Sequence, residues 1–453
     1  MNVLILGAGR VGLGVAFYLK EQDMNVTVVE ESPELVFKIR NSSDINIIQG
    51  SALDAEVLKN ANAENSTHLI ATMPNDEQNI LACKLADALF NVGTKIARIR
   101  SYSFLRNNMS ELFFKDNFGI DMLIHPELEI AKYISDVASV NGAFDVIKLN
   151  SIIVVGLKCK NSTEVINTTF KHFQNITNLH LFVLTITRDK KTFFPSSDDL
   201  LLPEDEVYIL TVPGDFDKVM TLFGYPPNEQ NFLIVGGGNI GTFTIQTILK
   251  SNPSSHITLL EKSKHQAEKI AQNYPTITTI LGNALDSCLL REISSDVSTA
   301  VIATNSDKIN VLSSLLLKQL NVKRVLTIME NRNYDSLLSV NSGCSIVDPI
   351  SITTETIIQK TRRWNITSAI RLKNSSSYVI EVEVCESCSC LGAKIEYLRE
   401  KNSITPIFVI RRGEIIWAKK DIQFMMNDRL IILVSKDKIS AMERVFSNYF
   451  FAG

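Results

Sequence analysis

The chain has 453 residues, of which 21% are charged and 45% are hydrophobic, and its formal net charge is −3. A soluble chain of this length is expected to form two to four domains. The near-neutral balance argues against a nucleic-acid-binding protein, and no apolar run approaches the roughly 18 residues that span a bilayer. With a first strand expected from Asn2, we expect no secretory signal. Seven cysteines, an odd number, favour a reducing compartment.

Residues 3–6 form a short, branched apolar run that predicts a buried strand, and a helical pattern follows the glycines after it. In a dinucleotide site of spacing Gly-x-Gly-x-x-Gly, the first glycine allows a tight turn and the second lets the backbone approach a pyrophosphate. The third lets helix and strand pack closely. The predicted phosphate-binding loop comprises Gly7, Ala8, Gly9, Arg10, Val11 and Gly12.

A second strand is expected over 25–29, and Glu30 stands at its end. A carboxylate about 20 residues after the glycines is where ribose hydroxyls are bound, and it would repel a 2′-phosphate. Glu30 therefore favours NAD or NADH, with ADP and ATP as alternatives, over NADP. A purely structural alternative stays open, in which the glycines only form a turn and Glu30 is a solvated strand end.

Strands and helices alternate through the first 135 residues, which predicts an α/β fold with a doubly wound parallel sheet and right-handed crossovers. Further strands are expected over 45–48, 68–71, 95–99 and 120–124. Helices are expected over 34–40, 54–61, 80–90, 105–117 and 129–140.

A small α+β unit with mixed strand pairing is expected next, and the adjacent prolines Pro226 and Pro227 mark its end. Its expected strands cover 145–149, 152–157, 181–188 and 206–212, with a helix over 163–173.

The pattern then starts again, which predicts a tandem duplication. The glycine spacing returns at Gly236, the acidic strand end returns at Glu261, and residues 282–285 match 50–53, all at offsets between 229 and 232 residues. The segment from Thr304 is matched to the segment from Thr72 in the same way. The predicted domains are two Rossmann-like lobes, each followed by a small α+β lobe: 1–135, 136–227, 228–362 and 363–453.

These features resemble the TrkA family, the cytosolic regulatory subunits of bacterial Trk potassium uptake systems, which carry two tandem regulator-of-potassium-conductance units. The resemblance covers essentially the whole chain. It rests on the glycine loop with Glu30, on Thr72 followed by the motif at 76–79, and on residues 96–100. It implies a nucleotide-binding regulatory subunit that controls potassium uptake through a membrane Trk subunit. It also implies a homo-oligomer, peripheral on the cytoplasmic face of the cell membrane.

The resemblance also implies ligand-contacting residues in both lobes. In the first lobe these include Ser51, Ala52, Thr72, Met73 and Pro74. In the second lobe they are Gly236, Gly238, Asn239, Ile240, Gly241, Glu261, Asn283, Ala284 and Thr304.

The chain departs from the family pattern at several of these positions. Ser51 and Asn283 stand where the family usually has an acidic residue, and residues 327–329 are matched to Arg98–Arg100 without keeping the arginines. The first lobe is therefore the better candidate for a charged ligand. Weak binding, a different nucleotide or a structural role stay open for the second lobe.

Two arginines near the end of the fifth strand are further candidates for the ligand. Residues i and i+2 of a strand share a face, so Arg98 and Arg100 would both point toward the ligand if the strand runs straight to Arg100. Arg10 would add its guanidinium to the backbone donors of the loop. The alternative for each arginine is a surface ion pair.

A soluble NAD-dependent oxidoreductase is the alternative function, and a nucleotide sensor for a different transporter is another. Hydride transfer needs a positioned acid or base, and only His125 is placed after a strand in a way that suggests one. We therefore expect no enzyme and no catalytic residue. The cluster of Cys385, Cys388 and Cys390 leaves metal binding, redox sensing and an incidental loop open, and we expect no metal because a structural zinc site needs four ligands.

Overall fold

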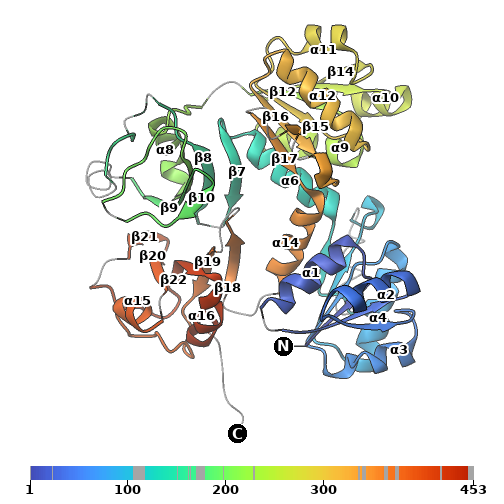
Figure 1. Ribbon diagram of the computed structural model, residues 1–453, viewed down its shortest axis with the longest axis vertical. Coiled ribbons are helices and arrows are strands. Elements are labelled where there is room, and N and C mark those ends of the chain that lie inside the picture. The colour runs from blue at the N-terminus through green and yellow to red at the C-terminus, as the bar shows by residue number, and fades with distance from the viewer. Residues whose placement is uncertain are drawn as a thin grey trace. The chain divides into compact units, whose positions relative to one another are not determined.

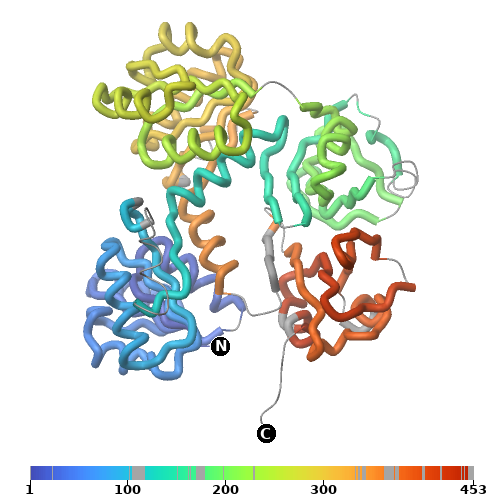
Figure 2. The backbone as a smooth tube through the Cα atoms, turned by 180° about the vertical axis from the view of Figure 1, so that it is seen from behind, coloured from blue at the N-terminus to red at the C-terminus, as the bar shows by residue number. Residues whose placement is uncertain are grey.

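The fold is given by a computed structural model (Figures 1 and 2). The structure describes residues 2–22, 24–105, 118–149, 151–161, 163, 165–169, 179–196, 198–227, 230–334, 337–338, 343–361, 366–372, 377–402, 404–418 and 421–446. The chain clusters into two compact units, each built from two separate stretches. One unit holds residues 1–135 and 230–361, and the other holds residues 136–229 and 362–453.

In the first lobe, six parallel strands form a sheet in the order β3-β2-β1-β4-β5-β6. The strand order reverses beside β1, and doubly wound sheets bind ligands at such a switch point. The elements are β1 (Asn2–Leu6), α1 (Arg10–Lys20), β2 (Asn25–Glu30), α2 (Pro33–Ser42), β3 (Asn46–Gln49), α3 (Ala55–Asn60), η1 (Ala63–Asn65), β4 (His68–Ala71), α4 (Asp76–Phe90), β5 (Thr94–Arg98), η2 (Tyr102–Leu105), β6 (Met122–Ile124) and α6 (Pro126–Ala138).

The second lobe repeats this topology, with six parallel strands in the order β14-β13-β12-β15-β16-β17. Its elements are β12 (Asn231–Val235), α9 (Asn239–Ser251), β13 (His256–Glu261), α10 (Lys264–Asn273), β14 (Thr278–Leu281), α11 (Ser287–Ile293), β15 (Thr299–Ile302), α12 (Asp307–Gln319), β16 (Arg324–Ile328), η4 (Arg332–Tyr334), β17 (Cys344–Val347) and α14 (Pro349–Thr361).

The sheet of the first lobe has a separate hydrophobic core on each face. Leu58 of α3 and Ala82 of α4 pack in one core, whereas Val15 of α1 and Val36 of α2 pack in the other. Because both faces are covered, all four residues of the central strand β4, His68 to Ala71, are buried, and the last three of them are apolar.

Helix α14 of the second lobe completes the core of the first. Its Ile357 is fully buried in the cluster that contains Val15 of α1. Figures 1 and 2 show α14 beside α1, and a Cβ on Gly14 would lie 3.0 Å from Thr354 Oγ1. The two lobes of this unit therefore share apolar burial at the helix that begins at the first glycine loop.

The other unit contains two small lobes, each with a five-stranded sheet. The orders are β10-β9-β11-β8-β7 and β18-β19-β22-β20-β21. The first small lobe comprises β7 (Ala143–Lys148), β8 (Ile153–Lys158), β9 (Leu181–Arg188), β10 (Lys191–Phe193), β11 (Glu206–Thr211), η3 (Pro213–Asp215) and α8 (Phe216–Leu222). The second comprises β18 (Ile366–Arg371), β19 (Ser377–Glu383), α15 (Glu396–Asn402), β20 (Thr405–Arg411), β21 (Glu414–Trp417), β22 (Arg429–Ser435), η5 (Lys436–Lys438) and α16 (Ile439–Phe446).

The small lobes share one hydrophobic core and repeat one ion pair. Leu210 of the first and Phe408 of the second are both fully buried in that core. Arg188 donates hydrogen bonds from Nε and Nη2 to the two carboxylate oxygens of Asp205, at 2.8 and 2.7 Å. Arg411 donates to Asp428 through the same two nitrogens, with both bonds at 2.8 Å.

The α/β fold class with two tandem parallel sheets is confirmed, but several details differ from expectation. The mixed pairing expected for the first small lobe is wrong for its five-stranded sheet, because every pair of strands described in that sheet is antiparallel. The five-stranded sheet of the second small lobe is antiparallel as well. The helix expected over 163–173 is also wrong where residues are described, since Ile166 and Thr169 form isolated bridges with residues 200–201. The helix expected over 105–117 lies outside the described residues, apart from the last residue of η2.

Candidate functional site

The first glycine loop turns sharply between β1 and α1. Gly7 adopts a φ of +97°, in the left-handed region that favours glycine. A Cβ on Gly12 would lie 2.1 Å from the carbonyl oxygen of Gly7, so the close approach of helix to loop requires glycine there. Both positions are explained by the protein's own packing.

Gly9 has no such internal reason. A Cβ there would meet no atom within 4 Å, and the φ of −67° is ordinary. Gly9 is also the N-cap of α1, where it supplies no side-chain hydrogen bond to the first turn. The helix therefore starts with unfilled backbone donors beside open space, which is the arrangement that binds phosphate groups.

The Glu30 carboxylate connects the loop to the end of β2. Its Oε2 accepts a hydrogen bond from the Ala8 N–H at 2.7 Å, and its Oε1 accepts one from the Ser32 N–H at 2.8 Å. The structure thus gives Glu30 a role in holding the loop. Each carboxylate oxygen has a second lone pair, so ribose binding by Glu30 stays a prediction.

The remaining candidates of the first lobe lie on loops that follow strands β3 and β4. Ser51 Oγ accepts from the Leu53 N–H at 3.3 Å, and Ala52 is buried. Thr72 is buried too, with its Oγ1 donating toward the carbonyl oxygens of Leu6 and Gly7 at 3.1 and 3.3 Å. Met73 is partly exposed and Pro74 is exposed on the loop after β4, and Val11, in the first turn of α1, is partly exposed.

Two residues outside the predicted site, Asn79 and Asp76, connect the loop after β4 and the start of α4 to the end of β5. Asn79 is fully buried, accepts from the Met73 N–H at 2.9 Å, and donates to the carbonyl oxygens of Met73 and Arg98 at 2.9 and 2.8 Å. Asp76 accepts from the N–H groups of Arg100 and Ser101 at 2.7 to 3.0 Å. In the sequence, this motif stood out only through the family resemblance. The spacing of its residues did not predict that Asn79 and Asp76 would hydrogen-bond to the end of β5.

Arg98 and Arg100 take different directions. Strand β5 ends at Arg98, so the condition of a strand running straight to Arg100 is not met. Arg98 lies within 3.4 Å of the Thr72 carbonyl oxygen, and its buried Nε has no hydrogen-bond partner among the described residues. Burial, with the charge of Arg100, lowers the pKa of Arg98. Arg100 is exposed and its Nε lies 3.4 Å from Glu127 Oε1.

Arg10 reaches from the first glycine loop to the second lobe, where its guanidinium forms an ion pair with Glu330 just after β16. The side chains are 65% and 45% exposed. Sequence reasoning did not single out Glu330, because it lies 320 residues from Arg10 and belongs to no motif.

The second glycine loop copies the backbone of the first. Gly236 has a φ of +101°, a Cβ on Gly241 would lie 2.0 Å from the Gly236 carbonyl oxygen, and Gly238 is the uncapped N-cap of α9. Glu261 Oε2 accepts from the Gly237 N–H at 2.5 Å, and Glu261 Oε1 accepts from the Ser263 N–H at 2.7 Å.

The second loop also has a contact without a counterpart among the described residues of the first: Gln266 Nε2 donates to the Gly237 carbonyl oxygen at 2.6 Å. Of the other candidates, Asn283 Oδ1 accepts from the Leu285 N–H at 3.1 Å and Ala284 is buried. Asn239 and Ile240 begin α9.

The structure corrects two matches between the lobes by one residue. The Thr304 N–H donates to Asn310 as the Met73 N–H donates to Asn79, so Thr304 corresponds to Met73 and not to Thr72. Asn310 Nδ2 donates to the Ile328 carbonyl oxygen as Asn79 donates to that of Arg98. Residues 328–330 therefore stand at Arg98–Arg100, which places Glu330 opposite in sign to Arg100.

His125 occupies a structural position. It is buried, its Nδ1 accepts from the Leu128 N–H at 3.3 Å at the start of α6, and its ring meets Phe243 edge-on at 5.3 Å. Burial lowers its pKa despite the neighbouring Glu127 carboxylate. No group of three or more metal-ligating side chains with suitable geometry is present in the described part of the chain.

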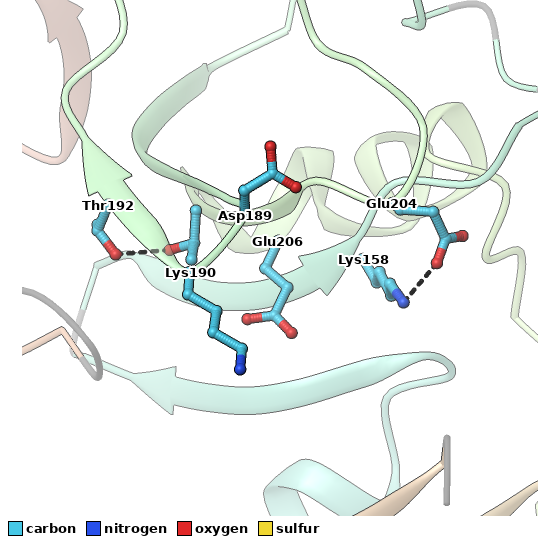
Figure 3. Close-up of a pocket in the computed structure, with 7 residues that line it drawn as sticks. Lys158, Asp189, Lys190, Thr192, Glu204 and Glu206 are labelled. Atoms are coloured by element: carbon cyan, nitrogen blue, oxygen red, sulfur yellow. Dashed lines mark hydrogen bonds and ion pairs between the residues drawn. The ribbon is translucent and has the colours of Figure 1, made fainter. Parts of the chain in front are cut away.

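A separate pocket of about 450 Å³ lies in the first small lobe (Figure 3). It is lined by Lys158, Thr187, Asp189, Lys190, Thr192, Glu204 and Glu206. Lys158 Nζ lies 2.5 Å from Glu204 Oε2, so part of its charge is neutralised internally. Its mixed charge selects neither an anion nor a cation, and it contains none of the residues predicted to bind nucleotide.

The fold and the two glycine loops define a protein with paired Rossmann-type nucleotide-binding lobes. A family model described as the TrkA-N domain matches residues 3–126 and again residues 232–347. The chain therefore belongs to the TrkA-N domain family, which confirms the resemblance seen in the sequence.

Relatives and solved structures match the chain over nearly its whole length. The Trk system potassium uptake protein TrkA of Azorhizobium caulinodans is 28% identical over 451 residues, with 98% of each chain covered. The protein of the same name from Haemophilus influenzae is 26% identical over 456 residues, also with 98% of each covered. The crystal structure of the GsuK RCK domain aligns with a TM-score of 0.59 at 14% identity, covering 98% of this chain and 94% of that one. The GsuK channel bound to NAD aligns with a TM-score of 0.60 at 16% identity, covering 98% and 78%.

Proposed function

We propose that this protein is a regulatory nucleotide-binding subunit that controls potassium uptake through a membrane Trk-type partner. The observation that carries the proposal is the pair of glycine loops, each with a second glycine that no internal contact requires and a helix start without a side-chain cap. Relatives named as potassium uptake proteins, covered over 98% of their length, support the potassium part of the proposal.

We propose NAD or NADH as the first ligand of the first lobe, with ADP and ATP as competitors. The residues present fit such a group: α1 offers backbone donors beside Gly9, and Glu30 stands at the end of β2. The buried Nε of Arg98 is a donor that a phosphate oxygen would satisfy. A related fold is described as bound to NAD, which supports the same choice.

The second lobe is the weaker candidate for a charged ligand. At the positions of Arg98 and Arg100 it carries Ile328 and Glu330, so it lacks both cations. The side chain of Gln266 in α10 also contacts the second glycine loop, because it donates a hydrogen bond to the Gly237 carbonyl oxygen. Whether or not it binds a ligand, the second lobe supports the first lobe structurally, because its helix α14 packs into the core of the first.

The proposed partner is a membrane subunit. None of the helices within the described ranges combines the length and the apolar character needed to cross a bilayer. The proposed location is the cytoplasmic face of the cell membrane, and the proposed assembly is a closed homo-oligomer, because contacts that fail to close would polymerise.

The proposed mechanism is a population shift. A nucleotide that binds one arrangement of the lobes more tightly than another favours that arrangement, and the partner follows. Arg10 gives a physical link, since a phosphate at the first loop would compete with Glu330 for its guanidinium. Ligand in the first lobe would then change a contact made by the second.

The test is potassium flux in proteoliposomes that contain the Trk-type membrane subunit of the same cell. We expect flux to depend on this protein and on NAD, NADH, ADP or ATP. Replacing Arg98 and Arg100 together by glutamine should uncouple flux from nucleotide and leave the thermal unfolding midpoint nearly unchanged. A matched control removes two exposed charges elsewhere, Lys262 and Lys269 on or beside α10. Flux that is identical with and without this protein under every nucleotide would refute the proposal.

A further inference from the structure

A cluster of three thiols lies in the turn between β19 and α15. The Sγ atoms of Cys385 and Cys388 are 2.9 Å apart, and the Cys385 N–H donates to Cys388 Sγ at 3.2 Å. The Cys388 N–H donates to the Cys385 carbonyl oxygen at 3.1 Å, which closes the turn that brings the two sulfurs together. A disulfide bond of about 2.05 Å would need the two sulfurs to approach by less than 1 Å.

The third thiol polarises the second. A hydrogen bond from Cys390 lowers the pKa of Cys388 from 9.0 to about 6, which outweighs its burial and the nearby Glu383 carboxylate. The same hydrogen bond, together with burial, raises the pKa of Cys390. Cys388 is therefore the thiolate of the cluster near neutral pH, and Cys390 keeps its proton.

The three thiols differ in access to solvent. Cys385 is partly exposed, whereas Cys388 and Cys390 are 4% and 0% exposed. Elsewhere, burial raises the pKa of Cys83 and of Cys159 to about 12, so these two thiols are poor nucleophiles. An accessible sulfur in contact with a buried thiolate is the arrangement of a thiol–disulfide exchange site.

We propose that Cys385 and Cys388 form a reversible disulfide by exchange with low-molecular-weight disulfides. In the first step Cys385 Sγ attacks an external disulfide, a mixed disulfide forms, and the released thiolate takes the proton of Cys385. In the second step the Cys388 thiolate attacks Cys385 Sγ, and the second external thiolate leaves and takes up the proton that Cys388 had given to solvent. Two protein thiols are oxidised by two electrons, and one external disulfide is reduced to two thiols.

The cluster also contacts the last described helix. Cys388 Sγ lies 3.7 Å from the Phe446 carbonyl oxygen, and Ser389 donates to the Val445 carbonyl oxygen through its N–H at 3.0 Å and its Oγ at 3.3 Å. Moving Cys388 Sγ toward Cys385 would alter the contact with Phe446. Oxidation is therefore expected to reduce protection of the end of α16 from hydrogen exchange.

The test equilibrates the full chain with mixtures of reduced and oxidised glutathione at pH 7, blocks remaining thiols by alkylation, and maps the cysteines by mass spectrometry. We expect a Cys385–Cys388 disulfide in the oxidised mixtures, with Cys390 alkylated and the bond reversed by excess reduced glutathione. Cys388→Ser should trap glutathione on Cys385, because the resolving thiolate is absent. Cys288, an exposed thiol of α11 outside the cluster, serves as an internal control.

Cys390→Ala separates this proposal from a purely structural turn. It should slow disulfide closure about tenfold at pH 7 and less at pH 9, because Cys388 then loses the hydrogen bond that favours its thiolate. Thermal unfolding of each variant checks that it has folded. Full alkylation of Cys385 and Cys388 in the most oxidised mixture would overturn the proposal. So would a Cys388–Cys390 bond in the wild type, or a glutathione adduct on Cys385 that the wild type fails to resolve.

Discussion

Arg10 of the first glycine loop and Glu330 of the second lobe form an ion pair across the two nucleotide-binding lobes. Because both side chains are substantially exposed, such a pair stabilises the fold by no more than about 1 kcal/mol. A phosphate group offers Arg10 a stronger, charge-assisted partner. The ion pair is thus weak enough for a phosphate group to replace Glu330 as the partner of Arg10, and its loss would signal that a ligand has bound.

Replacing Glu330 by glutamine should strengthen the binding of phosphate-bearing ligands to the first lobe. The change frees Arg10 from a competing carboxylate, and we expect the affinity for NAD or ADP to rise by up to about fivefold. Isothermal titration calorimetry measures the effect, and low salt should enlarge it. Glu292→Gln removes an exposed charge from α11 of the same lobe as a control. Equal gains in both variants would mean that general charge, and not the pair, is responsible.

Glu30→Gln and Glu261→Gln test which lobe holds the nucleotide. Each carboxylate accepts two backbone hydrogen bonds, and glutamine has only one acceptor oxygen, so each change should disturb its own loop. If the first lobe is the binding site, Glu30→Gln should lower affinity about 10- to 150-fold, from roughly 1.5–3 kcal/mol of charge-assisted bonding. Glu261→Gln should leave affinity near the wild-type value. The opposite ranking would move the site to the second lobe.

Asn79→Ala should destabilise the loops on both sides of the first site. The amide makes three hydrogen bonds to backbone groups at full burial, and the groups left without partners cost about 2–4 kcal/mol. We expect a lower midpoint of thermal unfolding and faster hydrogen exchange at residues 72–79. Asn60→Ala at the exposed end of α3 is the control, with little change expected. A midpoint unchanged by Asn79→Ala would show that solvent replaces these bonds at little cost.

His125 should contribute a decline of stability on the acid side. Burial lowers its pKa in the folded protein, so between the ordinary value of 6.5 and that lower value only the unfolded chain takes up the proton. Stability is therefore expected to fall as the pH drops below about 6.5. His125→Asn keeps an acceptor for the start of α6 and removes the titration, so its unfolding midpoint should fall less between pH 7.5 and 5.5. The exposed His265 on α10, replaced by asparagine, is the control; an identical acid decline in wild type and His125→Asn would contradict the assignment.

Local pattern was enough to predict the two glycine loops, the strand ends at Glu30 and Glu261, and the alternation of strands and helices. Pairing was not. The helix expected over 163–173 has helical apolar spacing, but Ile166 pairs with Leu201 from far along the chain. Periodicity within a segment carries no information about such a partner.

The one-residue errors between the lobes have a similar cause. The offset is 232 residues at Gly50 and Gly282, but it is 231 at Asn79 and Asn310, and 230 at Arg98 and Ile328. Short length differences in the connections shift the match, and only equivalent hydrogen bonds reveal the true correspondence. The importance of Glu330 could not be predicted, because its partner is set by how the lobes pack.

The burial of Ile357 of α14 against α1 makes each half of the duplicated chain a poor independent protein, since a first half made alone would expose that apolar surface to water. Two identical halves could cover each other equally well as a homodimer. What identical halves could never have is Arg100 on one side and Glu330 on the other. Joining the two copies in one chain permits the residues at this position to differ. One lobe can then specialise in nucleotide binding, while the other evolves the contacts that respond to the nucleotide.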